Sequence, residues 1–475
     1  MTQYFPGGTL VTQAHLDRLS SIDAGFLHQE DGGAHMHIGG LGIFEGPAPS
    51  GEQFRAHIAS RLPLVPRYRQ KLVQMPLGTG RPVWAEDAGF RVGYHVRHTA
   101  LPAPGGEEQL LTLASRIVSQ RLDRTKPLWE MWLVEGLAGN RFAVIAKTHH
   151  AMIDGVGGVD LLTALFDLSP DPAPVVAEPW QARNTPGALG LLTHGARDAA
   201  RHLARLGTRG AGLAVRPQQA VRQGRDLLAA LGAVAAPLVN GAPPTVLNRT
   251  PGPHRRVEVV RTPLADYKTV KQAFGVTVND VVLTAVAGAL GRFLQDRGES
   301  VAGLQLRACV PISLRRQDAQ AAAGNEITVM MAPLPVGITD PVQRLAVVRR
   351  SMEHLKSSRQ AEGARVLTSI ENALPPTVLA RASRLGFSSR MYNLLVTNVP
   401  GPQVPLYVLG RQLESLAPLA FLAPKHLLAI AVVSYHGQVT YGLLGDADGV
   451  PDLAALAKHL EDSLAELVHA ATASP

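Results

Sequence analysis

The chain contains two regions in which short apolar runs alternate with amphipathic stretches. In the first region, which extends to residue 170, the apolar runs at residues 37–46 and 141–150 have the length of buried strands. Between them, residues 107–122 repeat apolar positions at helical spacing. This alternation predicts an α/β fold in which helices pack on sheets.

The second region, residues 243–475, has the same character. Strands are predicted at residues 304–314, 326–336 and 427–444, and helices at residues 342–356 and 451–471. The run at 427–444 is interrupted by His436 and Gly437, which predicts a hairpin turn. The sequence therefore predicts two mixed α/β domains, at residues 1–170 and 243–475.

The segment between them, residues 171–242, has a different pattern. It opens with a proline-rich stretch and continues with alanine- and arginine-rich sequence of helical propensity. Arg197, Arg201, Arg205 and Arg209 recur every four residues and would lie along one side of a helix. We interpret the segment as a helical linker. Its arginine stripe is either a solvated face or a basic surface that binds anionic lipid.

Composition narrows the classes of protein. A hydrophobic share of 46% and a charged share of 18% are typical of a globular protein. The single cysteine, Cys309, forms no intrachain disulfide and excludes a multi-cysteine zinc site. The net charge of +8 suits phosphate-bearing ligands or anionic lipid, and no basic motif with interleaved aromatic residues indicates nucleic acid. No secretory signal or membrane-spanning run is found, so we expect a soluble or peripheral protein.

Candidate chemistry is concentrated at the end of the predicted strand 141–150. His149 and His150 stand side by side there, followed by Asp154 and Gly155. Three interpretations remain open: a turn with a structural histidine, a metal site, or a general base for acyl transfer. A metal site lacks a third nearby ligand. A serine nucleophile lacks its G-x-S-x-G motif, and Cys309 lies in an apolar run.

The sequence "HHAMIDG" resembles the HHxxxDG motif of the bacterial wax ester synthase/diacylglycerol acyltransferase family, which is related to chloramphenicol acetyltransferase. Further motifs of that family follow in the expected order along nearly the whole chain. They are the N-terminal block 19–46, Pro127-Leu128-Trp129, Asn279-Asp280, "ACVPISLR", "GNEI" and "VTNVPGP". The N-terminal block departs from the family's pattern, because it is richer in glycine and histidine around His35 and His37.

The resemblance implies two chloramphenicol acetyltransferase-like domains with mixed sheets, flanking helices and an active-site channel at their interface. It implies an acyl-CoA-dependent O-acyltransferase that forms triacylglycerol from diacylglycerol, wax esters from long-chain alcohols, or both. His150 would be the general base, reached by acyl-CoA from one side and by the acceptor from the other. No acyl-enzyme and no permanently bound cofactor are expected. Asp154 would pair with Arg315 and fix the loop.

Other motif residues have a structural alternative. Asn279 and Asp280 begin a predicted helix, so Thr277 or Asn279 either caps it or, as the resemblance implies, Asn279 and Asp280 contact substrate. Pro127, Leu128 and Trp129 either pack in the core or line the substrate site. His35 and His37 line a surface or a channel and receive no role. Residues 445–452 lack the ligands of a calcium loop and predict a turn.

Two other functions remain open for such a chain. One is an acyltransferase for polyketide or glycolipid hydroxyls, and the other is a catalytically silent lipid-binding protein of the same fold. For the acyl-CoA-dependent enzyme, the insoluble acceptors and products predict a cytoplasmic protein that is peripheral on the inner membrane face or on lipid droplets.

Overall fold

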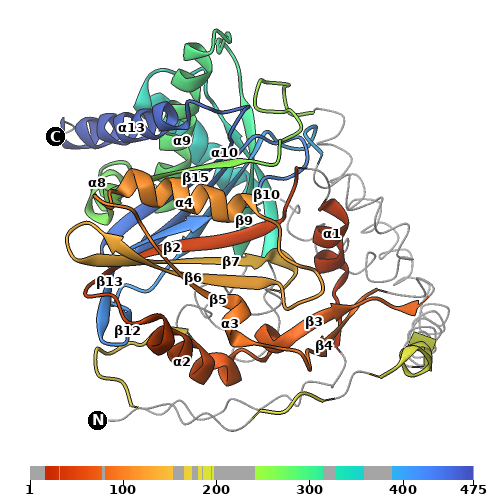
Figure 1. Ribbon diagram of the computed structural model, residues 1–475. Coiled ribbons are helices and arrows are strands. Elements are labelled where there is room, and N and C mark those ends of the chain that lie inside the picture. Colours follow the sequence, from red (N-terminus) through yellow and green to blue (C-terminus); the bar gives the residue numbers. More distant parts are fainter. Residues whose placement is uncertain are drawn as a thin grey trace.

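The computed structural model describes residues 17–30, 33–76, 81–152, 165–173, 180–183, 186–193, 195–196, 241–313, 327–357 and 388–473. Within these ranges the chain forms two six-stranded sheets and one three-stranded sheet, and helices pack against them (Figure 1). The predicted α/β class with mixed sheets is confirmed.

The first large sheet is built from the second half of the chain. Its strand order is β10-β9-β11-β14-β15-β8. The bounds are Ile327–Leu334 for β10, Leu306–Ser313 for β9, Leu394–Pro400 for β11, Leu428–Tyr435 for β14, Gln438–Asp446 for β15 and Arg255–Pro263 for β8. Strand β11 runs parallel to β9 and β14, and the other pairs are antiparallel.

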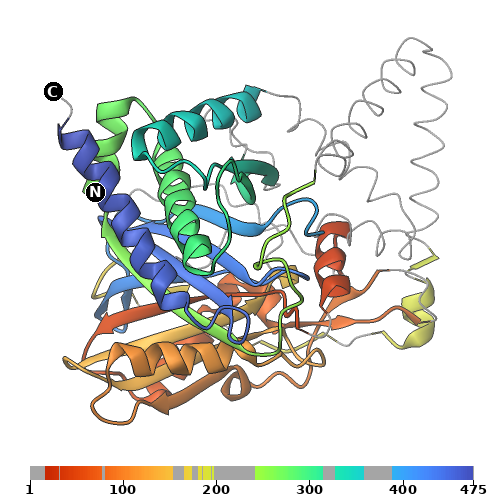
Figure 2. The same ribbon diagram turned by 90° about the horizontal axis from the view of Figure 1, so that it is seen from above.

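Helices cover one face of this sheet. They are α8 (Leu264–Phe274), α9 (Val278–Asp296), α10 (Pro341–Ser357) and α13 (Leu453–Ala473). Figure 2 shows α9 lying between α10 and α13. Because α9 is apolar on nearly all sides, it is buried along most of its length. Among the described helices none alone meets the length and hydropathy of a membrane span, although α8 and α9 do so jointly across a bend of 103°.

The second large sheet has the order β12-β13-β2-β7-β6-β5. The bounds are Tyr407–Val408 for β12, Arg411–Leu419 for β13, His37–Glu45 for β2, Arg141–His149 for β7, Trp129–Leu137 for β6 and Val96–Ala100 for β5. Strands β5 and β6 are parallel, and the other neighbours are antiparallel.

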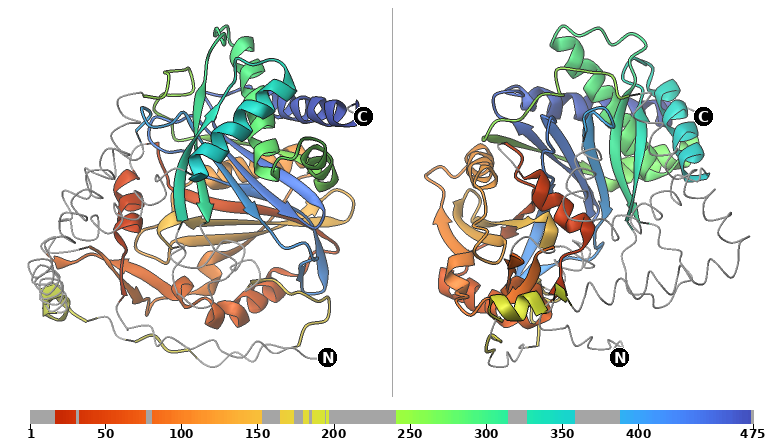
Figure 3. Two further views of the ribbon diagram at one scale, coloured as in Figure 1. Left: turned by 180° about the vertical axis from the view of Figure 1, so that it is seen from behind. Right: turned by 90° about the vertical axis from the view of Figure 1, so that its right-hand side faces the viewer.

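This second sheet combines both halves of the chain. Strands β12 and β13 come from the C-terminal half, yet β13 pairs with β2 from Leu413 opposite Phe44 to Leu419 opposite Gly39. Figures 1 and 3 show the C-terminal strands β12 and β13, in blue, beside the N-terminal strands, in red and orange. The sheets therefore do not divide at the predicted linker, because a strand pair that follows residue 243 completes the N-terminal sheet.

Helix α4 (Glu107–Ser119) joins the two large sheets. It contacts β2 of one sheet and β8 of the other. The hydroxyls of Ser115 and Ser119 accept hydrogen bonds from the backbone N–H groups of Val257 and Arg255, at 2.9 and 2.8 Å. These bonds satisfy donors on the outer edge of β8, where no further strand pairs among the described residues.

Smaller elements surround the second sheet. The three-stranded sheet has the order β1-β4-β3, with bounds Asp17–Arg18, Val83–Glu86 and Gln70–Val73. Helices α1 (Ser21–Gln29), α2 (Gly51–Arg61) and α3 (Val92–His95) pack nearby, and short 3₁₀ turns lie at Leu62–Leu64, Pro66–Arg69 and His150–Met152.

The elements predicted from periodicity are present, with small shifts at their ends. The hairpin turn at His436 and Gly437 is confirmed, and both residues have the positive φ values, 42° and 80°, of the turn that suits twisted strands. Thr277 is the N-cap of α9, as one interpretation predicted. Helix α4 ends at Ser119 and not at residue 122. Strand β7 ends at His149, so the prediction that it includes His150 was wrong by one residue.

Candidate active site

The two motif histidines lie at the point where β7 leaves its sheet. The backbone N–H of His149 donates to the carbonyl of Leu128 at 2.9 Å. This is the last backbone hydrogen bond between β7 and the chain that leads into β6. The N–H of His150 donates to the carbonyl of Met36, also at 2.9 Å, just before β2 begins. The chain then turns through His150–Met152. Strands on both sides thus hold the backbone of the pair.

The His149 side chain is held within the fold. It is buried, and its Nδ1 accepts a hydrogen bond from the N–H of Ala151 at 3.1 Å. In the neutral ring the proton is therefore on Nε2, which lies 3.8 Å from Oε2 of Glu30. Burial lowers the pKa of His149 to about 3, so the ring is neutral at neutral pH. The bond to Ala151 fixes the turn that carries His150.

His150 is only partly buried, and two aromatic rings hold its imidazole. Phe26 stacks on it with a centroid distance of 3.9 Å and an interplanar angle of 28°. Phe421 meets it edge-on at 5.6 Å. Burial of the ring lowers the pKa of His150 to about 4, so the imidazole is neutral and has a free lone pair at neutral pH. Of the two histidines, His150 is the one that is partly exposed to solvent.

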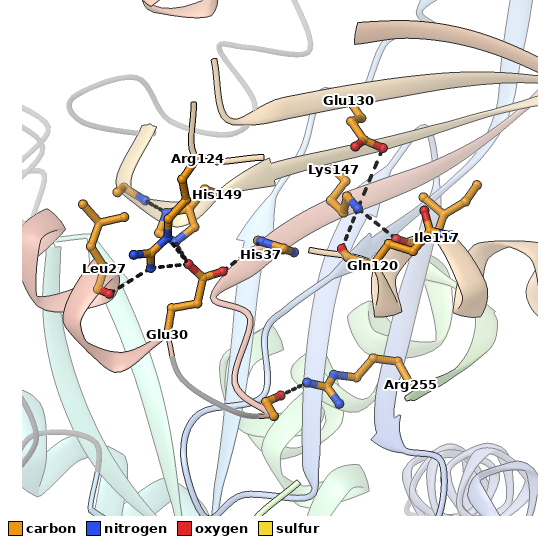
Figure 4. Close-up of polar contacts among 12 residues, drawn as sticks. Leu27, Glu30, His37, Ile117, Gln120, Arg124, Glu130, Lys147, His149 and Arg255 are labelled. Carbon is orange, nitrogen blue, oxygen red and sulfur yellow. Dashed lines mark hydrogen bonds and ion pairs between the residues drawn. The ribbon is translucent and has the colours of Figure 1, made fainter. Parts of the chain in front are cut away.

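The buried carboxylate of Glu30 lies near His149 and contacts several side chains around it. Glu30 accepts a hydrogen bond from Nε of Arg124 at 2.7 Å, and Arg124 also donates to the carbonyl of Leu27 at 3.0 Å (Figure 4). Nε2 of His37 lies 3.3 Å from Oε1 of Glu30. One carboxylate thus faces a guanidinium and two imidazoles, those of His37 and His149.

His35 and His37, for which the sequence analysis proposed no role, lie in the cluster formed by Glu30, Arg124 and His149. The rings of His35 and His37 are 5.7 Å apart, and those of His37 and His149 are 5.8 Å apart. Burial is the main cause that lowers the pKa of His35 to about 4 and the pKa of His37 well below its ordinary value. Sequence reasoning assigned no role to Glu30 either, although Glu30 lies in the N-terminal block that resembles the family.

A narrow cavity, partly open to solvent and with room for about one water molecule, lies beside this cluster. Its polar lining consists of His35, His37, Lys147 and Arg255, and its apolar lining includes Met36 and Phe421. Met36 and Phe421 also contact His150, through the backbone bond and the aromatic ring respectively. The cavity therefore adjoins the residues that hold His150.

Both cations of the cavity are tied to the backbone. Nζ of Lys147 donates to the carbonyls of Ile117 and Gln120, at 2.9 and 2.8 Å, at the C-terminal end of α4 (Figure 4). Arg255 donates to the carbonyls of Gly33 and Gly252. Burial lowers the pKa of Lys147 to about 8.

The Pro127-Leu128-Trp129 element packs in the core, as one interpretation predicted. All three residues are buried. The indole N–H of Trp129 donates to the carbonyl of Tyr68 at 2.8 Å, and the His95 ring stacks on the indole at 4.7 Å. These contacts use the polar atom of the indole within the fold. A substrate-binding role of the element remains a prediction.

Asn279 and Asp280 occupy the first turn of α9. The carboxylate of Asp280 accepts a hydrogen bond from the backbone N–H of Thr277 at 2.9 Å, and the Thr277 hydroxyl accepts from the N–H of Asp280, which forms a capping box. Oδ1 of Asn279 accepts from Nδ2 of Asn398 at 3.2 Å. Their contact with substrate also remains a prediction.

Several predicted site residues lie outside the described residues. These are Asp154, Gly155, Arg315 and the arginine stripe Arg197, Arg201, Arg205 and Arg209. The predicted turn at residues 445–452 is confirmed by a bond from the N–H of Gly449 to the Asp446 carboxylate. In the described part of the chain no group of three or more His, Cys, Asp or Glu residues could hold a metal. Cys309 is buried, which raises the pKa of its thiol to about 12 and makes it a poor nucleophile.

Comparisons with known proteins cover nearly the whole chain. The model of the wax ester synthase/diacylglycerol acyltransferase catalytic domain matches residues 19–282, and that of the WS/DGAT C-terminal domain matches residues 323–468. Two Mycobacterium tuberculosis proteins named probable diacylglycerol O-acyltransferases are 34% and 35% identical to this chain. The alignments cover 95% and 96% of this chain and 96% and 99% of those proteins.

Solved structures agree with this result. The wax ester synthase/diacylglycerol acyltransferase from Marinobacter aquaeolei VT8 is 27% identical, with a TM-score of 0.66, over 96% of this chain and 100% of that chain. The first condensation domain of the calcium-dependent antibiotic synthetase is similar in fold. It is 16% identical with a TM-score of 0.60, and the match covers 97% of each chain.

Proposed function

Because the chain belongs to the wax ester synthase/diacylglycerol acyltransferase family and is an acyltransferase, we propose that it transfers a long-chain acyl group from acyl-CoA to a lipid hydroxyl. The acceptor is diacylglycerol, a long-chain alcohol, or both, and the products are triacylglycerol and wax ester. Acyl-CoA is a co-substrate, and no permanently bound cofactor takes part.

The observation that carries this proposal is the environment of His150. Its ring is held between Phe26 and Phe421 at the end of a buried strand, remains partly exposed, and is neutral. A positioned, neutral imidazole within reach of substrate is what a general base for a hydroxyl requires. His149 lacks this freedom, because its Nδ1 is bonded to Ala151 and its Nε2 faces Glu30.

In the proposed reaction, His150 takes the proton of the acceptor hydroxyl as that oxygen attacks the thioester carbonyl carbon. The carbon–sulfur bond then breaks, and the leaving thiolate of coenzyme A takes the proton from the imidazolium. No acyl-enzyme forms, because both substrates meet at the same base. Holding them together removes much of the entropic barrier to the reaction.

The tetrahedral intermediate carries an oxyanion, which needs a hydrogen-bond donor. A backbone N–H or the side chain of Asn279 supplies it. Since Oδ1 of Asn279 accepts from Asn398, the amide hydrogens on its own Nδ2 remain available for donation.

The site of action follows from the chemistry of the substrates. Acceptors and products of this kind are nearly insoluble, so the enzyme meets them at the cytoplasmic face of the inner membrane or on lipid droplets. The sequence 191–240 contains seven arginines and two aspartates, a net charge of +5 out of the chain's +8, which supports attraction to anionic lipid.

A direct assay tests the proposal. Labelled palmitoyl-CoA is incubated with hexadecanol or dioleoylglycerol, and products are separated by thin-layer chromatography. We expect wax ester, triacylglycerol or both. Absence of both products would overturn the proposed substrates, and transfer only to polyketide or glycolipid hydroxyls would replace them.

The role of His150 is tested by His150→Ala. Loss of a general base costs on the order of 10²–10⁴ in rate, so kcat should fall at least a hundredfold while the melting temperature stays near that of the wild type. The matched control is His98→Ala, an exposed histidine on β5. A His150→Ala enzyme within tenfold of wild-type kcat would contradict the assignment.

A further inference from the structure

The Glu30 carboxylate is buried, and the proposed chemistry gives it no task. The exposed fraction of its side chain is 5%. Nε of Arg124 donates to Oε2 at 2.7 Å, and Arg124 approaches from the solvent side, because 47% of its own side chain is exposed. Removing a carboxylate from water is costly unless charged or polar partners compensate. Arg124 supplies part of that compensation.

His37 and His149 lie around the same carboxylate (Figure 4). Their Nε2 atoms are 3.3 Å from Oε1 and 3.8 Å from Oε2 of Glu30, respectively. The two residues are opposite each other in the register of β2 and β7, and their rings are 5.8 Å apart. Neither Nε2 atom has a hydrogen-bond partner among the described residues. Glu30 is thus a charged group that acts on both of these buried nitrogens.

The turn that carries His150 depends on the tautomer of His149. Nδ1 of His149 accepts a hydrogen bond from the N–H of Ala151 at 3.1 Å, which requires the ring proton to be on Nε2. With the proton on Nδ1, two N–H groups would point at each other and this bond would be lost. Because the bond spans His150, the tautomer of the first histidine determines how firmly the second is held.

The charge of Glu30 favours the tautomer that the turn needs. An anion near Nε2 attracts an N–H at that position and repels a lone pair. Burial lowers the pKa of His149 to about 3, and the charge of Glu30, which acts in the opposite direction, does not reverse this. The ring therefore stays neutral at neutral pH, and the carboxylate acts on the position of the ring proton.

We propose that Glu30 is a positioning residue for His150, because it keeps the proton of His149 on Nε2 and so preserves the bond that holds the turn. Arg124 and His37 keep the carboxylate in place. The inference rests on the proposed role of His150 as the general base. A shift of about 1 Å in a catalytic group costs about 100-fold in rate, so a loosened turn should lower kcat more than it raises KM.

Glu30→Gln tests the proposal, because it keeps the size of the side chain and removes the charge. A glutamine amide presents either its oxygen or its NH₂ group to His149, so it no longer favours one tautomer. The assay uses palmitoyl-CoA and whichever of hexadecanol and dioleoylglycerol the wild type esterifies faster. We expect kcat to fall at least tenfold and KM to stay within threefold of wild type. A smaller fall in kcat, or a loss that lies in KM alone, would overturn the proposal.

Asp87→Asn is the matched control. Asp87 is also a buried carboxylate, 1% exposed, and it pairs with Lys71 at 2.8 Å. Within the described part of the chain it forms no hydrogen bond or ion pair with His149 or His150. Its neutralisation should lower the melting temperature, as Glu30→Gln does, yet leave kcat within threefold of wild type. An equal fall in kcat in both variants would reduce the role of Glu30 to stability and contradict the proposal.

A double variant tests whether Glu30 acts through His149. In His149→Asn, the side-chain oxygen takes the place of Nδ1 as the acceptor for the N–H of Ala151 and has no tautomers. Adding Glu30→Gln to this variant should lower kcat less than threefold, whereas the same change lowers kcat at least tenfold in the wild-type background. A tenfold loss in both backgrounds would exclude an action through His149.

The tautomer itself is measured by ¹⁵N NMR of enzyme labelled at histidine, which requires no activity. The signals of His149 are identified by their absence from His149→Asn. We expect the proton on Nε2 in the wild type and a mixture of both tautomers in Glu30→Gln. An unchanged tautomer in Glu30→Gln would overturn the proposal. So would a proton on Nδ1 in the wild type, which decides the question if Glu30→Gln does not fold.

The outcomes separate this inference from the proposed function. If the wild type esterifies neither acceptor, the proposed function fails, and the NMR comparison still shows whether Glu30 sets the tautomer of His149. If the wild type is active and His150→Ala is not, but Glu30→Gln keeps its kcat, the general base stands and the positioning role of Glu30 is overturned.

Discussion

At the scale of the residue, two adjacent histidines differ in what they can do. His149 is buried and bonded to the turn that follows it, whereas His150 is partly exposed between two phenylalanine rings. The difference arises from where the strand ends. Because β7 stops at His149, the next residue leaves the sheet and begins the 3₁₀ turn His150–Met152.

The pH dependence of activity follows from this environment. Burial lowers the pKa of His150 to about 4, so the ring stays neutral as pH falls from 8 to 5.5 and loses its lone pair only below that range. We therefore expect the acid limb of the kcat/KM profile to lie below pH 5.5. The profile is measured with hexadecanol, and enzyme held at each pH is assayed again at pH 7.5 as a control for inactivation. An acid limb centred at pH 6.5 or above, with full recovery, would contradict the prediction.

The sequence predicted features that are formed by residues close together in the chain. It did not predict contacts between residues that are far apart in the chain. The histidine pair, the Thr277 cap and the packed Trp129 all follow from residues close together in the chain. Glu30 and Phe421 reach the same site from opposite ends of the chain, and no short-range pattern connects them with His150. Only the paired strands bring them together.

At the scale of the element, the β14–β15 hairpin shows where sequence signals are strong. His436 and Gly437 interrupt an apolar run, and both take positive φ values in the turn. The strand bounds and the turn agree with the prediction because the signal is confined to a few neighbouring residues.

The turn offers a clean test of backbone strain. Gly437 has a φ of 80°, and a Cβ added there would have no atom within 4 Å other than those of its chain neighbours. Gly437→Val should still destabilise the fold by about 1–2 kcal/mol, because positive φ is unfavourable for a residue with a Cβ and more so for a branched one. Urea unfolding measures the effect, with His436→Asn as the control, since asparagine tolerates positive φ. A Gly437→Val protein as stable as wild type would show that the turn relaxes.

At the scale of the whole molecule, the two halves share a sheet. The sequence analysis assigned residues 243–475 to a second α/β region and predicted no strand at residues 411–419. Strand β13 instead pairs with β2, and Leu406, Val408 and Leu413 pack into the hydrophobic cluster around Phe44 and Trp129. Periodicity predicts that a strand exists but not which sheet it joins, so this exchange could not be read from the sequence.

Because β13 of the C-terminal half pairs with β2, we expect that the N-terminal half does not fold into a stable protein by itself. A fragment of residues 1–242 lacks β12 and β13, which leaves β2 as an open edge and exposes the apolar residues that β13 covers. Unpaired edges and exposed apolar surface favour aggregation. We therefore expect the fragment alone to be insoluble or aggregated in size-exclusion chromatography. Co-expression with residues 243–475 should yield a soluble complex, because the missing strands are then supplied in trans. A monomeric 1–242 fragment that unfolds cooperatively would show that the N-terminal sheet is stable without β13, and the predicted boundary would then mark two independent domains.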